Sequence, residues 1–343
     1  MIPLLAMHST LQDRDAASWL TRRAVLGALP LAGCGVVTLA AEPLAVPGRY
    51  QNGTFVMQDG TRLPYRRWRP AGPPTVVALA LHGFNDSRDA WDLPATELCA
   101  AGFVIYAPDQ RGFGGTATRG QWSSTAQMVA DAADMARQVQ ALHPAAQLVL
   151  LGESMGGAVL MCLATSGQAP AGARYVLSAP AVWGRITMNA AMRLGLWLTS
   201  ALLPGLAVSR APVRVVASDN REALVRLSRD PLTLHTTRFG TLRGLVDLMD
   251  AALSAAPAFT APGLFLYGGR DELVPPGAMA RMWRRLPNGD TVRAYYPQAY
   301  HLLLRDMHRA APLQDIATWA QAADAPLPSG ADRAAESWLA RQP

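Results

Sequence analysis

The sequence predicts an α/β fold, with a mostly parallel central sheet, helices on both faces and a helical cap inserted after one strand. Three observations support this prediction. Continuous apolar runs alternate with helix-like stretches, as expected for parallel strands buried on both faces. These runs are Thr75–Leu81, Phe103–Ala107, Leu148–Leu151, Tyr175–Leu177 and Leu264–Tyr267. A serine framed by glycines follows the third run, and the alternation breaks between Pro180 and about Arg238.

The composition is that of a globular protein. Hydrophobic residues make up 50% of the 343 residues and charged residues 16%, which excludes a disordered chain and suits one large domain with an insertion. The net charge is +6, and all 31 basic residues are arginines. These arginines are scattered and form no basic stripe with interleaved aromatic residues, so we expect no nucleic-acid partner.

The N-terminal residues predict export. Arg22 and Arg23 precede the apolar run Ala24–Ala32, which is the order of charged and hydrophobic regions in an export signal. The run leads into Cys34, and the segment from Leu31 to Cys34 resembles the lipobox of bacterial lipoproteins, in which the cysteine is acylated. This resemblance implies lipid attachment at Cys34 and a membrane-anchored protein of the cell envelope that faces the periplasm.

Three other interpretations of this end stay open. A plain signal would leave a secreted or periplasmic protein, an uncleaved helix over residues 24–41 would anchor the chain, and an ordinary helix would leave it cytosolic.

The expected division of the chain is an export signal (1–33), a tether (34–50), the α/β domain (51–325) with its cap at about 181–238, and a C-terminal tail (326–343). Cys99 and Cys162 lie in apolar contexts, so we expect no structural disulfide.

The serine framed by glycines is the strongest local signal. Gly152-Glu153-Ser154-Met155-Gly156 matches G-x-S-x-G, the tight strand-to-helix turn that exposes a nucleophilic serine above a sheet. Gly152 and Gly156 are expected where side chains would collide with the neighbouring strand and helix. The new helix points its N-terminus at Ser154, which favours negative charge on a bound carbonyl oxygen.

A serine needs a base, and the base needs a group that orients it. At such elbows the partners follow in the order serine, acid, histidine. Asp271 follows an apolar strand and a glycine turn, with Glu272 as the fallback acid. His301 follows a strand-like segment and a turn, so we expect it to be the base. Of the other histidines after Ser154, His235 precedes the acid and His308 lies further along the predicted helix.

Two backbone N–H groups must stabilise the developing oxyanion. Met155 supplies one because it follows the nucleophile, and the loop after the third strand is expected to supply the other from Phe84. His82 in the same loop is interpreted as a structural residue.

Together these segments resemble the α/β-hydrolase superfamily, in particular its monoacylglycerol lipase, lysophospholipase and serine aminopeptidase type. The matching segments, within about residues 50–320, are His82–Phe84, Asp109–Gly114, Gly152–Gly157, Gly269–Pro275 and His301–Leu304. The resemblance implies Ser154 as nucleophile, His301 as base, Asp271 as its orienting acid, and the N–H groups of Phe84 and Met155 as the oxyanion hole. It also implies that the loop from Asp109 shapes the sheet. Phe84 and Asn85 are larger than the residues common after His-Gly in monoacylglycerol lipases.

We therefore expect a serine-dependent carboxylic ester hydrolase of the lipase or esterase type, with no cofactor and no metal. The uncharged stretch Leu194–Val208 lies in the cap, which should cover the site because it follows a strand end. An apolar cap favours acyl lipids such as monoacylglycerols or lysophospholipids as substrates. One alternative is a serine aminopeptidase or amidase, whose amine pocket could use the cap acids Asp219, Glu222 and Asp230. A second is a non-catalytic envelope scaffold.

Overall fold

The computed structural model describes residues 50–209 and 215–343. The predicted export signal (1–33), the lipid attachment at Cys34 and all of the tether (34–50) except its last residue lie outside these residues.

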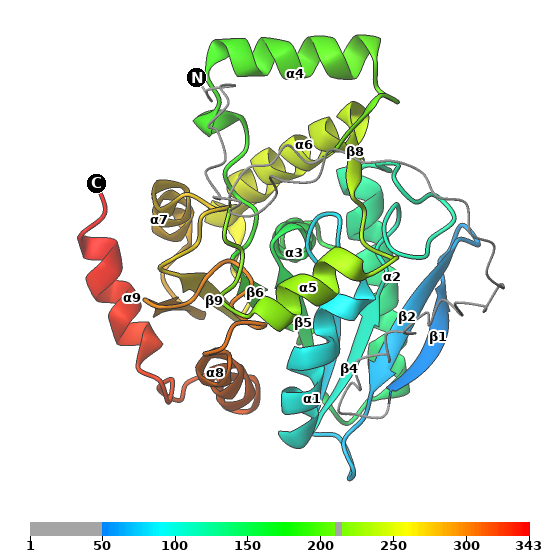
Figure 1. The fold of residues 1–343 in the computed structure, drawn as a ribbon. Coiled ribbons are helices and arrows are strands. Elements are labelled where there is room, and N and C mark those ends of the chain that lie inside the picture. Colours follow the sequence, from blue (N-terminus) through cyan, green and yellow to red (C-terminus); the bar gives the residue numbers. More distant parts are fainter. Residues whose placement is uncertain (1–49, 210–214) are drawn as a thin grey trace, which may run out of the picture. The chain divides into compact units, whose positions relative to one another are not determined.

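The described residues form an eight-stranded sheet with the order β1-β2-β4-β3-β5-β6-β9-β10 (Figure 1). The first strands pair antiparallel, and all pairings from β4 to β10 are parallel. The strands are β1 (Tyr50–Val56), β2 (Arg62–Trp68), β3 (Val76–Leu81), β4 (Phe103–Pro108), β5 (Gln147–Glu153), β6 (Arg174–Ser178), β9 (Gly263–Gly268) and β10 (Thr291–Tyr296). The five apolar runs correspond to β3, β4, β5, β6 and β9, so the predicted fold class is confirmed.

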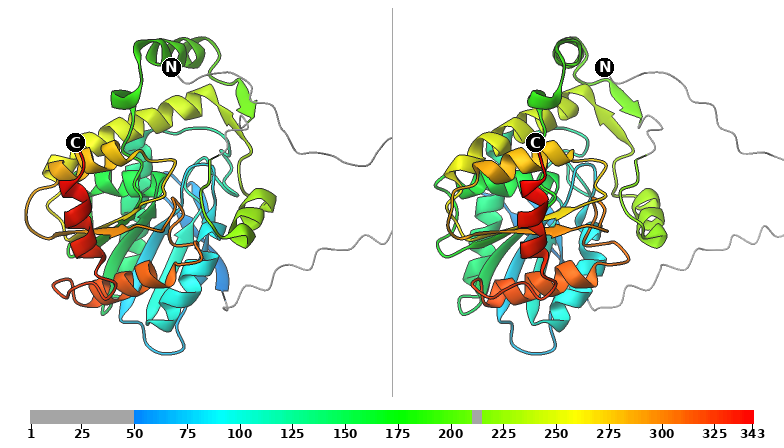
Figure 2. Two further views of the ribbon diagram at one scale, coloured as in Figure 1. Left: turned by 60° about the vertical axis from the view of Figure 1, so that its left-hand side comes forward. Right: turned by 90° about the vertical axis from the view of Figure 1, so that its left-hand side faces the viewer.

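Helices cover both faces of the sheet (Figure 2). One apolar cluster joins one face to α2 (Thr125–Leu142), α3 (Met155–Ala164), α6 (Phe239–Ala255) and α7 (Pro276–Arg285). A second cluster joins the opposite face to α1 (Asp92–Ala100) and α8 (Ala310–Gln321). Because each central strand is buried on both sides, its sequence is continuously apolar rather than alternating.

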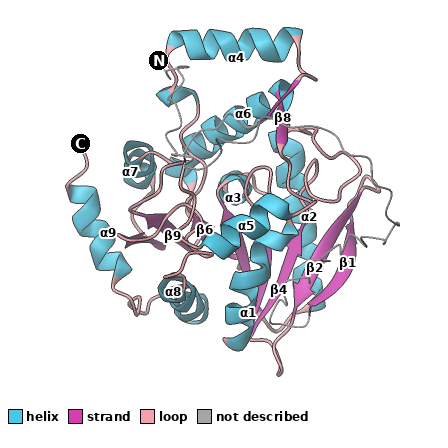
Figure 3. Cartoon of the chain, viewed as in Figure 1, coloured by secondary structure: helices cyan, strands magenta, loops and turns pink. Residues whose placement is uncertain are grey.

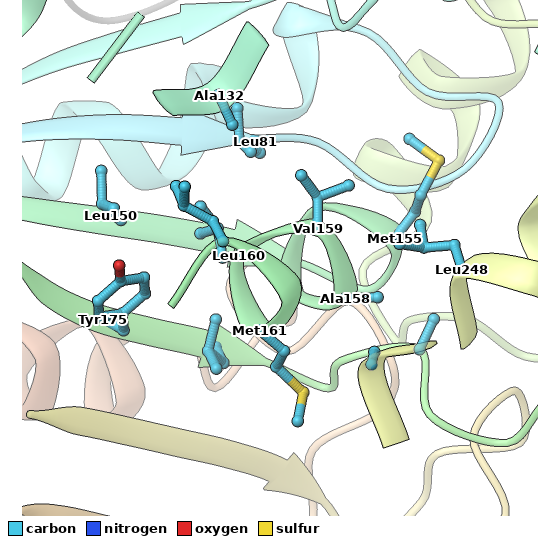
Figure 4. Close-up of a cluster of buried hydrophobic side chains, with 14 of the residues drawn as sticks. Leu81, Ala132, Leu150, Met155, Ala158, Val159, Leu160, Met161, Tyr175 and Leu248 are labelled. Atoms are coloured by element: carbon cyan, nitrogen blue, oxygen red, sulfur yellow. The ribbon is translucent and has the colours of Figure 1, made fainter. Parts of the chain in front are cut away.

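The first cluster holds α3 in place behind the glycine-framed serine. Figure 4 shows Val159 and Leu160 of α3 among side chains from β3, β5, β6, α2 and α6. Met155, the first residue of α3, is fully buried there and lies near Leu248. The helix that follows Ser154 is therefore fixed by packing as well as by its turn.

The segment expected to form the cap lies between β6 and α6. It contains the short 3-10 helix η2 (Arg185–Thr187), α4 (Ala190–Leu202), α5 (Arg221–Arg229), and the two strands β7 (Ala207–Ser209) and β8 (Thr236–Arg238), which pair antiparallel (Figure 3). Helix α4 lies beside α6 and buries only Leu196 and Ser200, so most of its apolar side chains face outward.

The C-terminal segment 326–343 is more than a tail. It contains α9 (Ala331–Ala340), which packs on β10. Trp338 stacks on Tyr295 of β10 with their ring centroids 5.1 Å apart. Since β10 is the edge strand of the sheet, α9 covers aromatic surface that would otherwise meet water, and the domain extends beyond residue 325.

Candidate active site

Ser154 lies in the sharp turn between β5 and α3, with φ of +53° and ψ of −111°. A positive φ is strained for a residue with a side chain. The turn is held by backbone hydrogen bonds: the N–H of Ser154 donates to Ser178 O at 2.9 Å, and Ser154 O accepts from Ala158 N and Ala181 N. The turn thus fixes the backbone of Ser154, and the residue is half-buried.

The two framing glycines are required for steric reasons. A Cβ at Gly156 would overlap the carbonyl oxygen of Leu81 in β3. A Cβ at Gly152 would lie 2.7 Å from the backbone of Gly156 and Gly157. The elbow can therefore form only because the strand, the turn and the helix approach one another without side chains.

The structure pairs the predicted acid with the predicted base. His301 Nδ1 lies 2.8 Å from Asp271 Oδ2, and both side chains are buried. The other oxygen of Asp271, Oδ1, accepts from the N–H groups of Leu273 and Val274 at 2.8 and 2.9 Å. Because an ionised carboxylate only accepts hydrogen bonds, Nδ1 of His301 carries the proton, and Nε2 is left as the basic nitrogen.

Glycines also allow two loops to meet: the loop after β9, which carries Asp271 (the acid loop), and the loop after β10, which carries His301 (the histidine loop). A Cβ at Gly268 would lie 2.5 Å from the carbonyl oxygens of Ala299 and Tyr300. The loops are joined by the N–H of Arg270, which donates to Ala299 O at 2.9 Å. The glycine pair before Asp271 is therefore what brings its carboxylate to His301.

The environment of His301 sets its basicity. Burial lowers the pKa of the imidazole, but the charge and the hydrogen bond of Asp271, together with the charge of Glu153, outweigh this effect and raise the pKa above its usual 6.5. Arg305 acts in the opposite direction. Glu153 directly precedes Ser154, so one of the charges that act on the imidazole belongs to the elbow.

The loop after β3 passes next to Ser154. A Cβ at Gly83 would lie 3.5 Å from the Cβ of Ser154. Among residues 50–209 and 215–343, no protein acceptor receives the backbone N–H of Phe84 or of Met155. Both N–H groups are thus available to an oxygen atom bound beside Ser154.

His82 holds this loop rather than facing a substrate. Its Nε2 accepts from the N–H of Gln110 at 3.1 Å, which leaves the proton on Nδ1 to donate to Gly83 O at 2.8 Å. The ring is fully buried. These contacts agree with the structural role expected for His82.

The fallback residues lie elsewhere. Glu272 is exposed and its Oε2 accepts from Val216 N in the cap, whereas His235 and His308 are exposed on the surface. Only Asp271 is therefore paired with His301. In the described part of the chain no cluster of three or more His, Cys, Asp or Glu side chains could hold a metal ion.

The second half of the cap is bonded to the loops that carry the site. Asn85, the residue after Phe84, makes two of these bonds: its carbonyl oxygen accepts from Leu234 N, and its Nδ2 donates to Thr237 Oγ1. On the other side Leu302 N donates to Ala217 O at 2.9 Å, and Asn220 Nδ2 donates to Arg305 O. The cap therefore contacts both the histidine loop and the loop after β3 that carries Phe84, which we call the oxyanion loop.

One group was missed by the sequence reasoning. Arg305 is buried and donates through Nη2 to both Asp86 and Glu153. The available signal was Glu153, a charged residue at the end of the largely apolar strand β5. Because a buried carboxylate needs a partner, it indicates that a cation lies nearby.

No helix among residues 50–209 and 215–343 combines the length and the apolar character needed to cross a bilayer.

Comparison with known proteins places the chain in a family. Residues 72–308 match the family described as "Serine aminopeptidase, S33". The monoacylglycerol lipase of Mycolicibacterium smegmatis is 27% identical over 275 residues, which are 78% of this chain and 95% of the relative. The monoglyceride lipase of Rattus norvegicus is 27% identical over 272 residues, which are 77% of this chain and 88% of the relative.

Solved structures agree on the fold. A monoacylglycerol lipase of Paleococcus ferrophilus has a TM-score of 0.65 at 22% identity, covering 76% of this chain and 98% of its own. A soluble variant of the monoglyceride lipase of Saccharomyces cerevisiae, in complex with a substrate analog, has a TM-score of 0.69 at 19% identity, covering 81% of this chain and 97% of its own. All five predicted residues of the core site lie inside the matched family region, and the chain belongs to the serine aminopeptidase family of α/β-hydrolases.

Proposed function

We propose that this protein hydrolyses carboxylic esters of acyl lipids, with Ser154 as nucleophile, His301 as base and Asp271 as the group that orients it. The observation that carries the proposal is the buried pair of His301 and Asp271, which leaves Nε2 of the imidazole as the basic nitrogen, together with the strained turn that holds Ser154 after β5.

The reaction proceeds in two halves. Ser154 Oγ attacks the ester carbonyl carbon while His301 Nε2 takes its proton, and the N–H groups of Phe84 and Met155 donate to the resulting oxyanion. Collapse of this intermediate breaks the ester C–O bond, and Nε2 returns the proton to the leaving alcohol. Water then attacks the acyl-enzyme with Nε2 again as base, which releases the acid and restores Ser154.

The preference for acyl lipids is supported by the cap. The segment from α4 to β7 exposes large apolar side chains: Leu194, Trp197, Leu198, Leu202, Leu203, Leu206 and Val208. Exposed apolar surface of this kind on the cap of an ester hydrolase favours long acyl chains over acetyl groups. The two relatives described above are named monoacylglycerol lipase and monoglyceride lipase, which supports the same substrate class.

The amidase alternative has less support from the cap acids. Asp219 Oδ1 accepts from Met307 N at 2.8 Å, and Asp230 Oδ2 accepts from the hydroxyl of Ser87 at 2.8 Å. These two carboxylates are therefore already used in holding the cap to the core, and Glu222 is exposed on α5.

We further propose that the protein is anchored to a membrane of the cell envelope through a lipid on Cys34 and faces the periplasm. The sequence from Ala181 to Ser218 contains four arginines and no acidic residue, a charge bias that suits an anionic membrane surface. Metabolic labelling with a radioactive fatty acid should mark the wild-type chain and not Cys34→Ala. Equal labelling of both, or a soluble wild-type chain, contradicts the anchor.

The ester proposal is tested with a series of p-nitrophenyl esters from acetyl to palmitoyl, using the full chain in detergent. We expect turnover that rises with acyl length and disappears in Ser154→Ala. Ser166→Ala is the matched control, because Ser166 lies just beyond the far end of α3 and its hydroxyl bonds only to backbone groups, Leu163 O and Gln168 N. Faster turnover of acetyl than of octanoyl esters contradicts the acyl-lipid preference, and full activity in Ser154→Ala contradicts the mechanism.

A further inference from the structure

A single guanidinium group links the three loops of the candidate site. Arg305 lies four residues after His301, in the loop between β10 and α8, and its side chain is 6% exposed. Its Nη2 donates to Asp86 Oδ2 at 2.9 Å and also to Glu153 Oε1. The side chains of Asp86 and Glu153 are 7% and 3% exposed.

Each carboxylate belongs to a different part of the site. Glu153 is the last residue of β5 and directly precedes Ser154. Asp86 lies two residues after Phe84, and its Oδ1 accepts from Ser87 N at 2.8 Å within the same loop. Arg305 is itself fixed, because its N–H donates to Leu302 O at 2.7 Å and its carbonyl accepts from Asn220 of the cap.

We propose that Arg305 is a positioning residue, which fixes the nucleophile through Glu153 and the oxyanion loop through Asp86 relative to His301. The proposal rests on the proposed function, since it assigns Arg305 to the same site. It goes further by giving a role to a residue that contacts neither the serine nor the substrate.

Stability alone is a poor explanation for this cluster. Removing three charged groups from water is costly, and apolar side chains of similar size often stabilise a core as well or better. The cluster does provide directional bonds between loops that meet at the reacting atoms. A displacement of about 1 Å between reacting groups lowers rates by roughly 100-fold, so such bonds matter for catalysis.

The cluster also acts on the base electrostatically. The charged groups that act on His301 are Asp271 from the loop after β9, Glu153 from β5 and Arg305 from its own loop. Glu153 favours the protonated imidazole and Arg305 disfavours it. Removing Arg305 should therefore raise the pKa of His301, whereas removing the charge of Glu153 should lower it. A purely structural role predicts no such opposite shifts.

Kinetics of the full chain on p-nitrophenyl octanoate provide the first test. Arg305→Met should lower kcat by about 100-fold and leave KM within about threefold, because positioning affects the reacting atoms more than substrate binding. Arg111→Met is the matched control: Arg111 is similarly buried and joins Asp131 and Asp59, away from the serine. The control should lose stability and keep its kcat within about threefold of wild type.

The second test measures the titration of His301 directly, by NMR with 13C-labelled histidine. The chain has six histidines, and the spectrum of His301→Gln identifies the relevant signal. The midpoint should rise in Arg305→Met and fall in Glu153→Gln. If Arg305→Met does not fold, the downward shift and a reduced kcat in Glu153→Gln decide the proposal.

A kcat of Arg305→Met close to wild type overturns the proposal, and so does a reduced kcat with an unmoved midpoint in either variant. The titration also separates this proposal from the proposed function. If the wild-type chain hydrolyses no ester but the midpoints move as described, the proposed function fails and the positioning role stands.

Discussion

Asn85 Nδ2 lies 2.7 Å from Thr237 Oγ1, so the oxyanion loop is bonded side chain to side chain with strand β8 of the cap. Asn85 has a positive φ of 62° and is buried. Its carbonyl oxygen also accepts from Leu234 N at 2.8 Å. The residue after Phe84 is therefore held on two sides by the cap, which couples the cap to the geometry of the proposed oxyanion hole.

Thr237→Val should weaken this coupling. The substitution keeps the shape of the side chain and removes the oxygen that accepts from Asn85 Nδ2. Loss of this hydrogen bond costs about 1 kcal/mol. Because the oxyanion loop then shifts, we expect kcat/KM to fall by roughly fivefold. The measurement is kcat/KM on p-nitrophenyl octanoate. Thr236→Val is the control, because Thr236 is exposed in the same strand. Equal effects of the two substitutions contradict the coupling.

Gly156→Ala should abolish activity. Its Cβ would overlap the carbonyl oxygen of Leu81, the last residue of the buried strand β3, and overpacking of this kind costs about 1–3 kcal/mol or more. Thermal unfolding and ester hydrolysis measure the effect. Gly277→Ala in α7 is the opposite control, since nothing lies within 4 Å of its added Cβ. That variant should be active and about 0.5–1 kcal/mol more stable. Wild-type activity in Gly156→Ala would mean that the turn is not as tight as described.

The pH profile should report His301. The base must be neutral to accept the proton of Ser154, and Asp271 and Glu153 raise its pKa despite burial, so the acid limb of kcat/KM should have its midpoint above the usual 6.5. In Asp271→Asn this limb should move to lower pH while kcat falls by about 10⁴-fold, as the orienting charge is lost. Glu272→Gln is the matched control and should leave both quantities unchanged. A midpoint below 6.5 in the wild type contradicts the balance of charges described for this site.

The same pKa shift predicts a pH-dependent contribution to stability. A histidine whose pKa is higher in the folded than in the unfolded chain stabilises the fold fully below its unfolded pKa, and this contribution is lost as pH rises through the folded value. The melting temperature of the wild type should therefore exceed that of His301→Gln most at acidic pH, below 6.5, with a smaller difference in alkaline buffer. A difference that grows with pH contradicts the raised pKa.

The two described cysteines should stay reduced and unreactive. Both are free, and burial raises the pKa of Cys162 to about 11 and of Cys99 to about 12. A thiol with so high a pKa has little nucleophilic thiolate near neutral pH. In a Cys34→Ala background, iodoacetamide at pH 8 should modify neither residue on a timescale of minutes, as measured by mass spectrometry. Rapid modification of either cysteine, or a fall in melting temperature on reduction, contradicts this description.

Local sequence predicted the parts of the site that are made locally. The strand, the two glycines and the helix around Ser154 lie within one short segment, so sterics and hydrophobic pattern were sufficient there. The choice of Asp271 over Glu272 depended on chain order and on the preceding glycines. The structure supplies its physical reason, because Gly268 lets the histidine loop pass close to the residue that follows the turn.

Contacts between distant segments could not be predicted in this way. Arg305 meets partners that are 152 and 219 residues away in sequence, and only the assembled sheet brings them together. The exposure of the apolar side chains of α4 could not be predicted from the sequence either. Its apolar residues were compatible with an ordinary core helix, and only the packed structure shows that Leu196 and Ser200 alone are buried in it. The helix α9 has few large apolar residues, and its packing depends on the aromatic edge of β10.

The central claim is that Ser154 becomes covalently acylated. The most direct measurement is to quench the full chain during turnover of p-nitrophenyl octanoate with acid, digest it and locate the acyl group by mass spectrometry. Our account predicts an octanoyl adduct on Ser154, which should be absent in Ser154→Ala and should form together with p-nitrophenol before octanoic acid is released. Steady hydrolysis by the wild-type chain with an adduct on another residue, or hydrolysis that persists in Ser154→Ala without any adduct, would contradict it.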